Sequence, residues 1–161
     1  MANKVELIYE AWKEYMASRK IAPFVHPSIA LSWERCHHNG IDPYDPLTDK
    51  SVLTEEELLA AQEKCKDLLE SSRPFVEALY QFVKGSGFMV IITDEQGWVL
   101  DLQGDPEIIQ NTSHLNFYPG SNWSEELRGT NAIGTVITGR RPLQVHATEH
   151  RQNPHFQIHK R

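Results

Sequence analysis

The chain has 161 residues, of which 40% are apolar and 24% charged, and its formal net charge is −6. This composition is typical of a globular protein long enough to bury a core. The acidic balance argues against direct binding to nucleic acid, because contact with phosphates requires a basic face. Cys36 and Cys65 have no paired spacing and predict reduced thiols in a cytoplasmic protein. No apolar run is long enough to cross a membrane, and the N-terminus lacks the apolar segment of a signal peptide.

Residues 1–50 predict an N-terminal helical segment. Apolar side chains recur at helical spacing over residues 5–16, with acids and lysines on the opposite face. A second, short helix is predicted from Ser28, interpreted as its N-cap, to a stop at Asn39-Gly40. One stripe of this helix carries Ile29, Trp33 and Cys36.

Residues 51–84 predict a long connector helix. Thr54 and Glu57 have the spacing of a capping box, and an apolar stripe continues to Val83. Pro74 removes a backbone hydrogen bond, so it marks either a kink or the boundary between two helices. A helix of this length suggests either a wrap around the core or a dimer seam.

A β-hairpin is predicted over residues 88–103, with a turn at 94–97. The first strand is almost continuously apolar, which predicts cover on both faces. The second strand alternates, which predicts that Trp98, Leu100 and Leu102 point inward. A short helix is expected around Ile108 and Ile109, and residues 143–147 alternate as a third strand.

Residues 123–135 combine a polar start with a run of small residues. Gly129 ends a short helical turn, and Thr130 or Asn131 is suited to cap the following helix. A helix rich in Ala, Gly and Thr lets its backbone approach a sheet or a ligand closely. Its first N–H groups point at whatever lies before it. The segment is therefore either a pocket wall or a tightly packed helix without a ligand.

The sequence offers weak signals for catalysis. A zinc-peptidase sequence motif is matched by His146, Glu149 and His150. In such enzymes the two histidines share one helix face and the glutamate is the general base. Here the first histidine follows a strand pattern, so a solvated polar tail is the better interpretation, with a zinc hydrolase kept as an alternative. A Walker A lysine and a nucleophile elbow are both missing. We predict no catalytic residues, no metal, no cofactor and no enzyme activity.

Four motifs resemble a family of bacterial transcription regulators. Ser32-Trp33-Glu34-Arg35-Cys36, followed by Gly40-Ile41-Asp42-Pro43, resembles the N-terminal signature of acetoin-catabolism-type regulators, which are sigma-54-dependent, enhancer-binding activators. Residues 120–135 together with Glu149-His150 resemble the signature of their sensory GAF domain. Residues 92–97 fit the first hairpin of that domain. The motifs come in the expected order and cover about residues 28–150.

The resemblance implies an α+β fold: a GAF-like antiparallel sheet with flanking helices, preceded by an N-terminal helical segment. The implied organisation is a helical segment at 1–50, a connector helix at 51–84 and a partial GAF-like sensory domain at 85–161. The domain is called partial because a GAF domain of this family continues with a helix and further strands after the position of His150. About three strands of the sheet are therefore predicted within this sequence. A downstream ATPase and a DNA-binding domain are implied for the full-length protein.

The function implied is that of a sensory domain coupling a small metabolite to the downstream ATPase, in a cytoplasmic homodimer. The expected ligand-binding residues are Trp123, Glu125, Thr130, Asn131, Gln144 and His146. Packing alternatives stay open: Trp123 as a core side chain, Thr130 and Asn131 as caps, and Glu125 paired with Arg128 or Arg140. A second hypothesis is a ligand-free dimerisation module with the helix at 54–83 as its seam.

Overall fold

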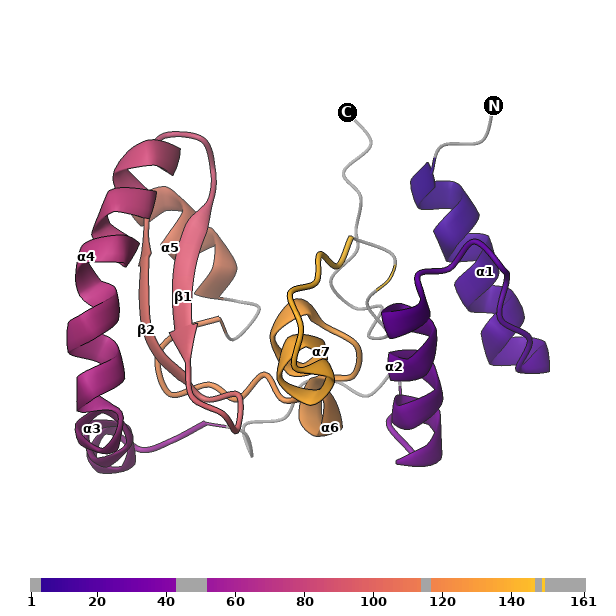
Figure 1. Ribbon diagram of the computed structural model, residues 1–161, viewed down its shortest axis with the longest axis horizontal. Coiled ribbons are helices and arrows are strands. Elements are labelled where there is room, and N and C mark those ends of the chain that lie inside the picture. The colour runs from indigo at the N-terminus through magenta and orange to yellow at the C-terminus, as the bar shows by residue number, and fades with distance from the viewer. Residues whose placement is uncertain (1–3, 43–51, 114–116, 147–148, 150–161) are drawn as a thin grey trace. The chain divides into compact units, whose positions relative to one another are not determined.

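The computed structural model describes residues 4–42, 52–113, 117–146 and 149. Within these residues the chain forms helices and one two-stranded antiparallel sheet (Figure 1). The α+β class predicted from the sequence is confirmed.

Contacts divide the chain into two units. One combines residues 1–47 with residues 123–161, and the other spans residues 48–122. The N-terminal helical segment therefore belongs with the predicted pocket segment, which follows it about ninety residues later. The domain boundaries predicted at residues 50 and 84 do not coincide with these units and stay a prediction.

The first unit begins with two helices around an aromatic core. Helix α1 spans Lys4–Ser18 and α2 spans Pro27–His38. Buried residues of the two helices and of the loop between them form one apolar cluster, which contains Ala11, Trp12, Tyr15, Val25, Ile29 and Trp33. Helix α2 starts earlier than predicted, because His26 rather than Ser28 is the N-cap: its Nδ1 accepts the Ser28 N–H at 3.2 Å. Proline at the first helical position suits this start, since that N–H has no intrahelical partner.

The same unit contains α6 (Glu125–Arg128) and α7 (Ala132–Gly139). Gly129 separates them in the left-handed region, with φ +66°. Asn131 caps α7, since its side-chain oxygen accepts the Gly134 N–H at 2.9 Å. A Cβ on Gly134 would lie 2.3 Å from the backbone nitrogen of Glu125. The predicted close approach of α7 is therefore made to the start of α6.

The third strand predicted over 143–147 is wrong for residues 143–146, which have no strand conformation, while Ala147 lies outside the described residues. Leu143 and Val145 are instead half-buried and pack against the α1–α2 core cluster. Apolar residues alternate in this segment because an extended chain packs one of its sides against the helices. Such a segment has the same two-residue period as a strand at the edge of a sheet.

The second unit opens with α3 (Glu55–Lys64) and α4 (Lys66–Val83). The capping box is confirmed: Thr54 Oγ1 accepts the Glu57 N–H at 3.2 Å, and Glu57 Oε2 accepts the Thr54 N–H at 2.8 Å. The single connector helix predicted at 51–84 is wrong, because the helix breaks at Cys65. Pro74 lies inside α4 and does not mark the boundary.

Tertiary contacts account for the position of that break. Helix α4 packs along both strands of the hairpin (Figure 1). Helix α3 lies against the second strand, where Gln62 donates its side-chain N–H to the Leu100 carbonyl at 2.8 Å. Helices α3 and α4 run in different directions, and each makes its own contacts with the hairpin. One straight helix could not make both sets of contacts.

The hairpin joins β1 (Met89–Thr93) to β2 (Val99–Gly104), and α5 (Pro106–Ser113) follows. Gly97 has φ +86° at the turn, as predicted for that position. A bulge lies between Ile92 and Thr93, and Val99 and Leu100 are both fully buried. Strict alternation along the second strand is therefore wrong, because a bulge adds one residue and shifts the register of side chains. All five residues of β1 are half-buried, so both faces of the strand are partly covered, which agrees in part with the prediction.

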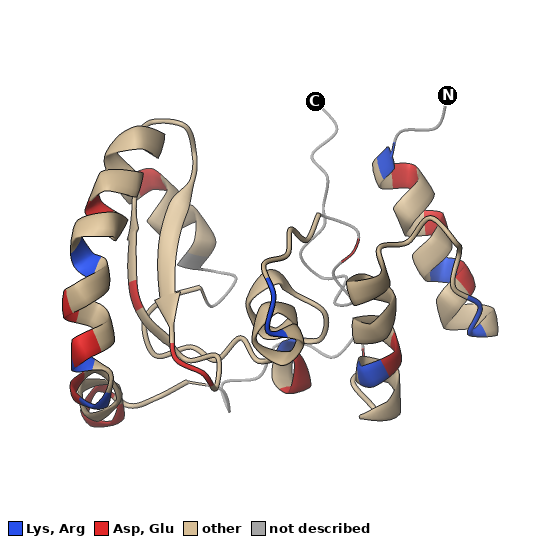
Figure 2. Cartoon of the chain, in the orientation of Figure 1, with Lys and Arg blue, Asp and Glu red and all other residues tan. Residues whose placement is uncertain are grey.

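Charged side chains are interspersed by sign along α1 and α4 (Figure 2). No helix of the described residues has the length and apolar character needed to span a bilayer.

Candidate functional site

A buried polar cluster joins α2 to the segment 125–135. Its centre is the Glu125 carboxylate, which is only 6% exposed. Oε2 of Glu125 accepts hydrogen bonds from Ser32 Oγ at 2.6 Å and from Thr135 Oγ1 at 3.0 Å. Ser32 Oγ also lies 2.8 Å from Thr130 Oγ1. Ser32, Thr130 and Thr135 are at most 2% exposed, so the cluster is closed to solvent on the side of the hydroxyls.

Arg35 completes the cluster from the solvent side. Its Nε and Nη2 donate to the two carboxylate oxygens of Glu125 at 2.7 and 3.0 Å. This two-pronged geometry is the strongest form of an arginine–carboxylate pair. The hydrogen bonds to Glu125 raise the pKa of Arg35 above its ordinary value, against the opposing effect of its partial burial. Helix α2 is thus held to α6 by a pair of opposite charges.

Asn131 holds the loop between α6 and α7 in place. Besides capping α7, its side-chain nitrogen donates to the carbonyl oxygens of Trp123 at 3.0 Å and of Gly129 at 2.9 Å. Of the two predicted caps, Asn131 performs this role, while Thr130 faces Ser32 and the Cys36 sulfur, 3.7 Å away. Both side chains are at most 3% exposed.

Trp123 and Arg128 form a separate contact beside the cluster. The guanidinium carbon of Arg128 lies 5.4 Å from the centre of the Trp123 ring, within cation–π distance. Both residues are buried, at 9% and 3% exposed. The ion pair predicted for Glu125 with Arg128 or Arg140 is therefore wrong, because Arg35 takes that place.

The other two predicted ligand residues lie apart from the cluster. Gln144 and His146 are exposed, on the extended segment after α7. The backbone N–H of His146 donates to the Glu149 carboxylate at 2.7 Å, and the Glu149 carbonyl accepts the Trp33 indole N–H at 2.9 Å. His150 lies outside the described residues, among which no group of three His, Cys, Asp or Glu side chains could hold a metal ion.

Sequence reasoning did not assign Ser32 or Arg35 to the site. A signal was present at Ser32, because it lies on the same helical stripe as Ile29, Trp33 and Cys36, all of which are buried. A hydroxyl on a buried stripe requires a hydrogen-bond partner from elsewhere in the fold. Arg35 follows one turn later, which brings its guanidinium to the same carboxylate.

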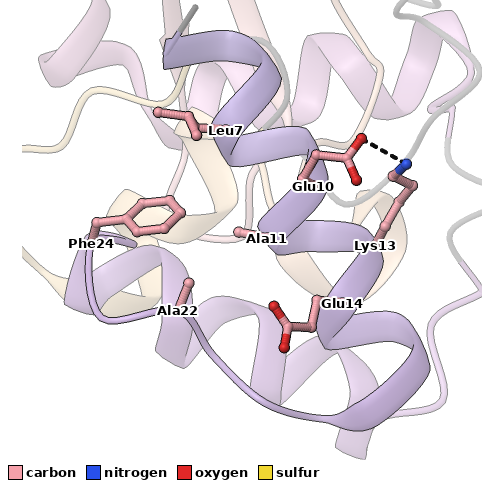
Figure 3. Close-up of a pocket in the computed structure, with 7 residues that line it drawn as sticks. All are labelled: Leu7, Glu10, Ala11, Lys13, Glu14, Ala22 and Phe24. Carbon is pink, nitrogen blue, oxygen red and sulfur yellow. Dashed lines mark ion pairs between the residues drawn. The ribbon is translucent and has the colours of Figure 1, made fainter. Parts of the chain in front are cut away.

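Residues of the first unit that the structure describes line two hollows. The larger, of about 490 Å³, is open and lies between α1 and the following loop. Figure 3 shows Phe24 and Ala22 of that loop facing Leu7 and Ala11 of α1, with the Glu10–Lys13 ion pair of 2.7 Å at the side. The smaller, of about 70 Å³, lies between α2 and α7 and the segment that follows α7. Its lining residues are Pro27, Ser28, Leu31, Arg35, Thr135, Gly139, Arg141 and Leu143.

Comparisons with known proteins place this architecture among regulators. The GAF domain family profile matches residues 67–160. A signal-transduction and transcriptional-control protein of Clostridium beijerinckii is 39% identical over 76% of this chain and 19% of that protein. The acetoin dehydrogenase operon transcriptional activator AcoR of Bacillus subtilis is 31% identical over 92% of this chain and 24% of that protein. The acetoin catabolism regulatory protein of Cupriavidus necator is 33% identical over 81% of this chain and 20% of that protein.

A solved structure shares the fold. A chain of the Escherichia coli DhaR(N)–DhaL complex superimposes with a TM-score of 0.72 at 23% identity, covering 79% of this chain and 42% of that chain. The present chain spans about a quarter or less of the length of the curated relatives above. Those relatives are regulators of transcription and not enzymes, in agreement with the prediction. By its sequence and its fold, this chain belongs to the GAF domain family and resembles part of the acetoin-type transcriptional activators.

Proposed function

We propose that this chain is the ligand-sensing regulatory domain of a bacterial sigma-54-dependent transcription activator. In this proposal, binding of a small metabolite in the cytoplasm is coupled to a downstream ATPase, and the domain itself does not contact DNA. The observation that carries it is the Glu125 cluster, which ties α2 to α6 and α7 through a buried carboxylate. Support also comes from the relatives, which are named as activators or regulators of metabolic operons.

The cluster has the properties of a two-state element. Its hydrogen bonds connect segments 90 to 103 residues apart, so they form or break together when α2 moves relative to α7. A ligand shifts such an equilibrium only if it binds one state more tightly. Buried charges are costly to leave unpaired, so intermediate positions of α2 are unfavourable. The domain would therefore report ligand as a change in the position of α2.

The proposed ligand wall consists of the predicted residues Trp123, Glu125, Thr130 and Asn131, with Gln144 and His146 contributing from the following segment. The first four are buried and already hydrogen-bonded or packed inside the protein. A ligand that reaches Glu125, Thr130 or Asn131 must replace those hydrogen bonds. Ligand binding at this wall and release of α2 would thus be the same event.

The test uses the full-length protein and calorimetry with acetoin and glycerol-type diols, followed by measurement of ATPase activity. Saturable binding that changes the ATPase rate is expected. Glu125→Gln should alter the ligand response, while Glu126→Gln, an exposed neighbour with the same loss of charge, should not. A folded protein that binds no member of a broad metabolite panel would reject the sensory function.

A second candidate function, a ligand-free dimerisation module, is favoured by the outer face of α4. Leu68, Phe75 and Phe82 recur every seven residues and are 46%, 76% and 88% exposed. This is the repeat of a helix that pairs with another helix. A second copy of the chain is the proposed occupant, because a homodimer would align two such seams.

The dimer hypothesis is tested by the mass of the chain in solution. Phe75→Glu with Phe82→Glu should convert a dimer to a monomer, whereas Gln81→Glu, also exposed on α4, should leave the dimer intact. If the wild-type chain is a monomer at every concentration, this candidate function fails.

A further inference from the structure

We infer that the smaller hollow of the first unit, between α2 and α7, binds a small organic acid through Arg35 and Arg141. This deepens the proposed sensory function and rests on it for the meaning of the ligand. The hollow is next to the wall proposed above: it shares Arg35 and Thr135 with the Glu125 cluster, but its lining includes none of the six predicted ligand residues.

The charges that line the hollow favour an anion. Of its eight lining residues, two are arginines and none is acidic. Arg35 is balanced by Glu125, whereas Arg141 has no ion pair within the described part of the chain. One positive charge is therefore left over, which a single carboxylate would neutralise.

The side chains that line the hollow include the donors that carboxylates prefer. Arg35 uses Nε and Nη2 on Glu125, which leaves Nη1 and its protons available for a second acceptor. Arg141 is exposed and reaches the hollow from the end of α7. Guanidinium groups bind planar oxyanions by paired, charge-assisted hydrogen bonds. A carboxylate held between these arginines would bridge α2 to the segment after α7.

Size and apolar lining narrow the class of ligand. The hollow measures about 70 Å³, and one water needs roughly 10–15 Å³ of such space, which gives room for about five to seven non-hydrogen atoms. Leu31, Leu143 and Pro27 supply apolar wall, and Ser28 and Thr135 bring hydroxyl-bearing side chains to it. The matching class is a three-carbon acid with a methyl group and a 2-hydroxy or 2-oxo group.

The experiment is calorimetry on the 161-residue chain with sodium lactate, its neutral analogue lactamide, and inorganic phosphate, all at one ionic strength. Lactate should bind saturably and raise the melting temperature, because a ligand bound only by the folded state stabilises it. Lactamide should bind at least about tenfold more weakly, since it lacks the charge that both arginines pair with. Phosphate binding as tightly as lactate would overturn the assignment to an organic acid.

Two matched variants locate the site. Arg141→Gln should weaken lactate binding about tenfold, the equivalent of one charge-assisted hydrogen bond. Arg140→Gln removes the same charge from the adjacent exposed position, which does not line the hollow, and should leave the affinity within about twofold. Equal losses in the two variants would mean non-specific attraction and would overturn the site.

The test of the acid site can fail or succeed independently of the test of the proposed sensory function. Binding of a neutral diol that Arg141→Gln leaves unchanged, without lactate binding, would reject the acid site and leave the sensory function standing. Lactate binding that has no effect on the ATPase of the full-length protein would support the acid site and show that lactate is not the signal of the proposed sensory function.

Discussion

The Glu125 carboxylate accepts two hydrogen bonds from the Arg35 guanidinium, at 2.7 and 3.0 Å, across 90 residues of sequence. The glutamate is 6% exposed and the arginine side chain 35% exposed. The pair therefore stands at the edge of the core, where the charge of Glu125 is sheltered from water and depends on its partner. Because α2 and α6 each contribute one member, the pair fixes α2 to the small-residue segment that begins at α6.

Removing the charge of Arg35 and removing the charge of Glu125 should both destabilise the first unit, but by different amounts. Arg35→Gln leaves a buried carboxylate without its cation and should cost about 3 kcal/mol, the lower range for breaking a buried pair. Glu125→Gln leaves a partly exposed guanidinium and should cost about 2 kcal/mol. The double variant should cost less than the sum, which urea unfolding and a double-mutant cycle would measure. Strictly additive losses would contradict the pairing, and Glu126→Gln serves as the surface control.

Gly134→Ala should separate α7 from α6. The added Cβ would lie 2.3 Å from the Glu125 nitrogen and 2.8 Å from the Ser124 carbonyl carbon, which are backbone atoms and cannot rotate away. Overpacking of this kind costs about 1–3 kcal/mol, and the upper half is expected here. Gly139→Ala in the same helix meets only the Arg141 side chain, at 3.9 Å, and should be neutral or slightly stabilising. Thermal melts of the two variants should differ, and equal melting temperatures would contradict the close approach.

Asn131 variants should distinguish its capping role from its hold on the loop. Asn131→Ala loses the cap and both donations, to the Trp123 and Gly129 carbonyls, and should cost about 2–3 kcal/mol. Asn131→Asp keeps an oxygen for the Gly134 N–H, but it places a buried carboxylate against those two carbonyl oxygens, and an unpaired buried charge is costly. Denaturant unfolding near neutral pH should therefore rank wild type above alanine, with aspartate no more stable than alanine. An aspartate variant clearly more stable than alanine would mean that the cap matters more than the hold on the loop.

In the second unit, Tyr80 should contribute stability that disappears at alkaline pH. Its hydroxyl donates to Asp105 Oδ1 at 3.0 Å, while Asp105 Oδ2 accepts the Gly85 N–H at 2.8 Å. Burial of the phenol, and then this hydrogen bond, raise the pKa of Tyr80 above its ordinary value of 10.0. A raised pKa in the folded state means that the contribution is fully present below the unfolded pKa and is lost as pH rises through the folded one.

Tyr80→Phe tests this dependence. It should be less stable than wild type near neutral pH, because the variant lacks the hydrogen bond to Asp105. The difference should shrink as the pH is raised past about 10, where the phenol begins to ionise. Tyr9→Phe, at an exposed position on α1, is the matched control and should change little at any pH. A Tyr80 difference that grows with pH would contradict the sign.

Local sequence determined much of the secondary structure, because the signals involved act within a few residues. The Thr54–Glu57 capping box, the Gly97 turn and the cap at Asn131 each depend on near neighbours in the chain. The stripe of α2 was readable for the same reason, since its period alone identifies the buried face. The resemblance to acetoin-type regulators likewise rested on short motifs in order, and the GAF assignment confirmed it.

Tertiary structure decided which of those elements pack against one another and which side chains meet. The partner of Glu125 could not be chosen between several arginines by sequence, because Arg35 becomes its neighbour only when α2 packs against α6. The break at Cys65 arises from two packing directions of α3 and α4, and the bulge beside Thr93 buries Val99 against the alternation. Residues 143–146 have the alternation of a strand, yet they pack on helices. Periodicity fixes which side of an element is apolar, and long-range contact energy then selects the surface that side meets.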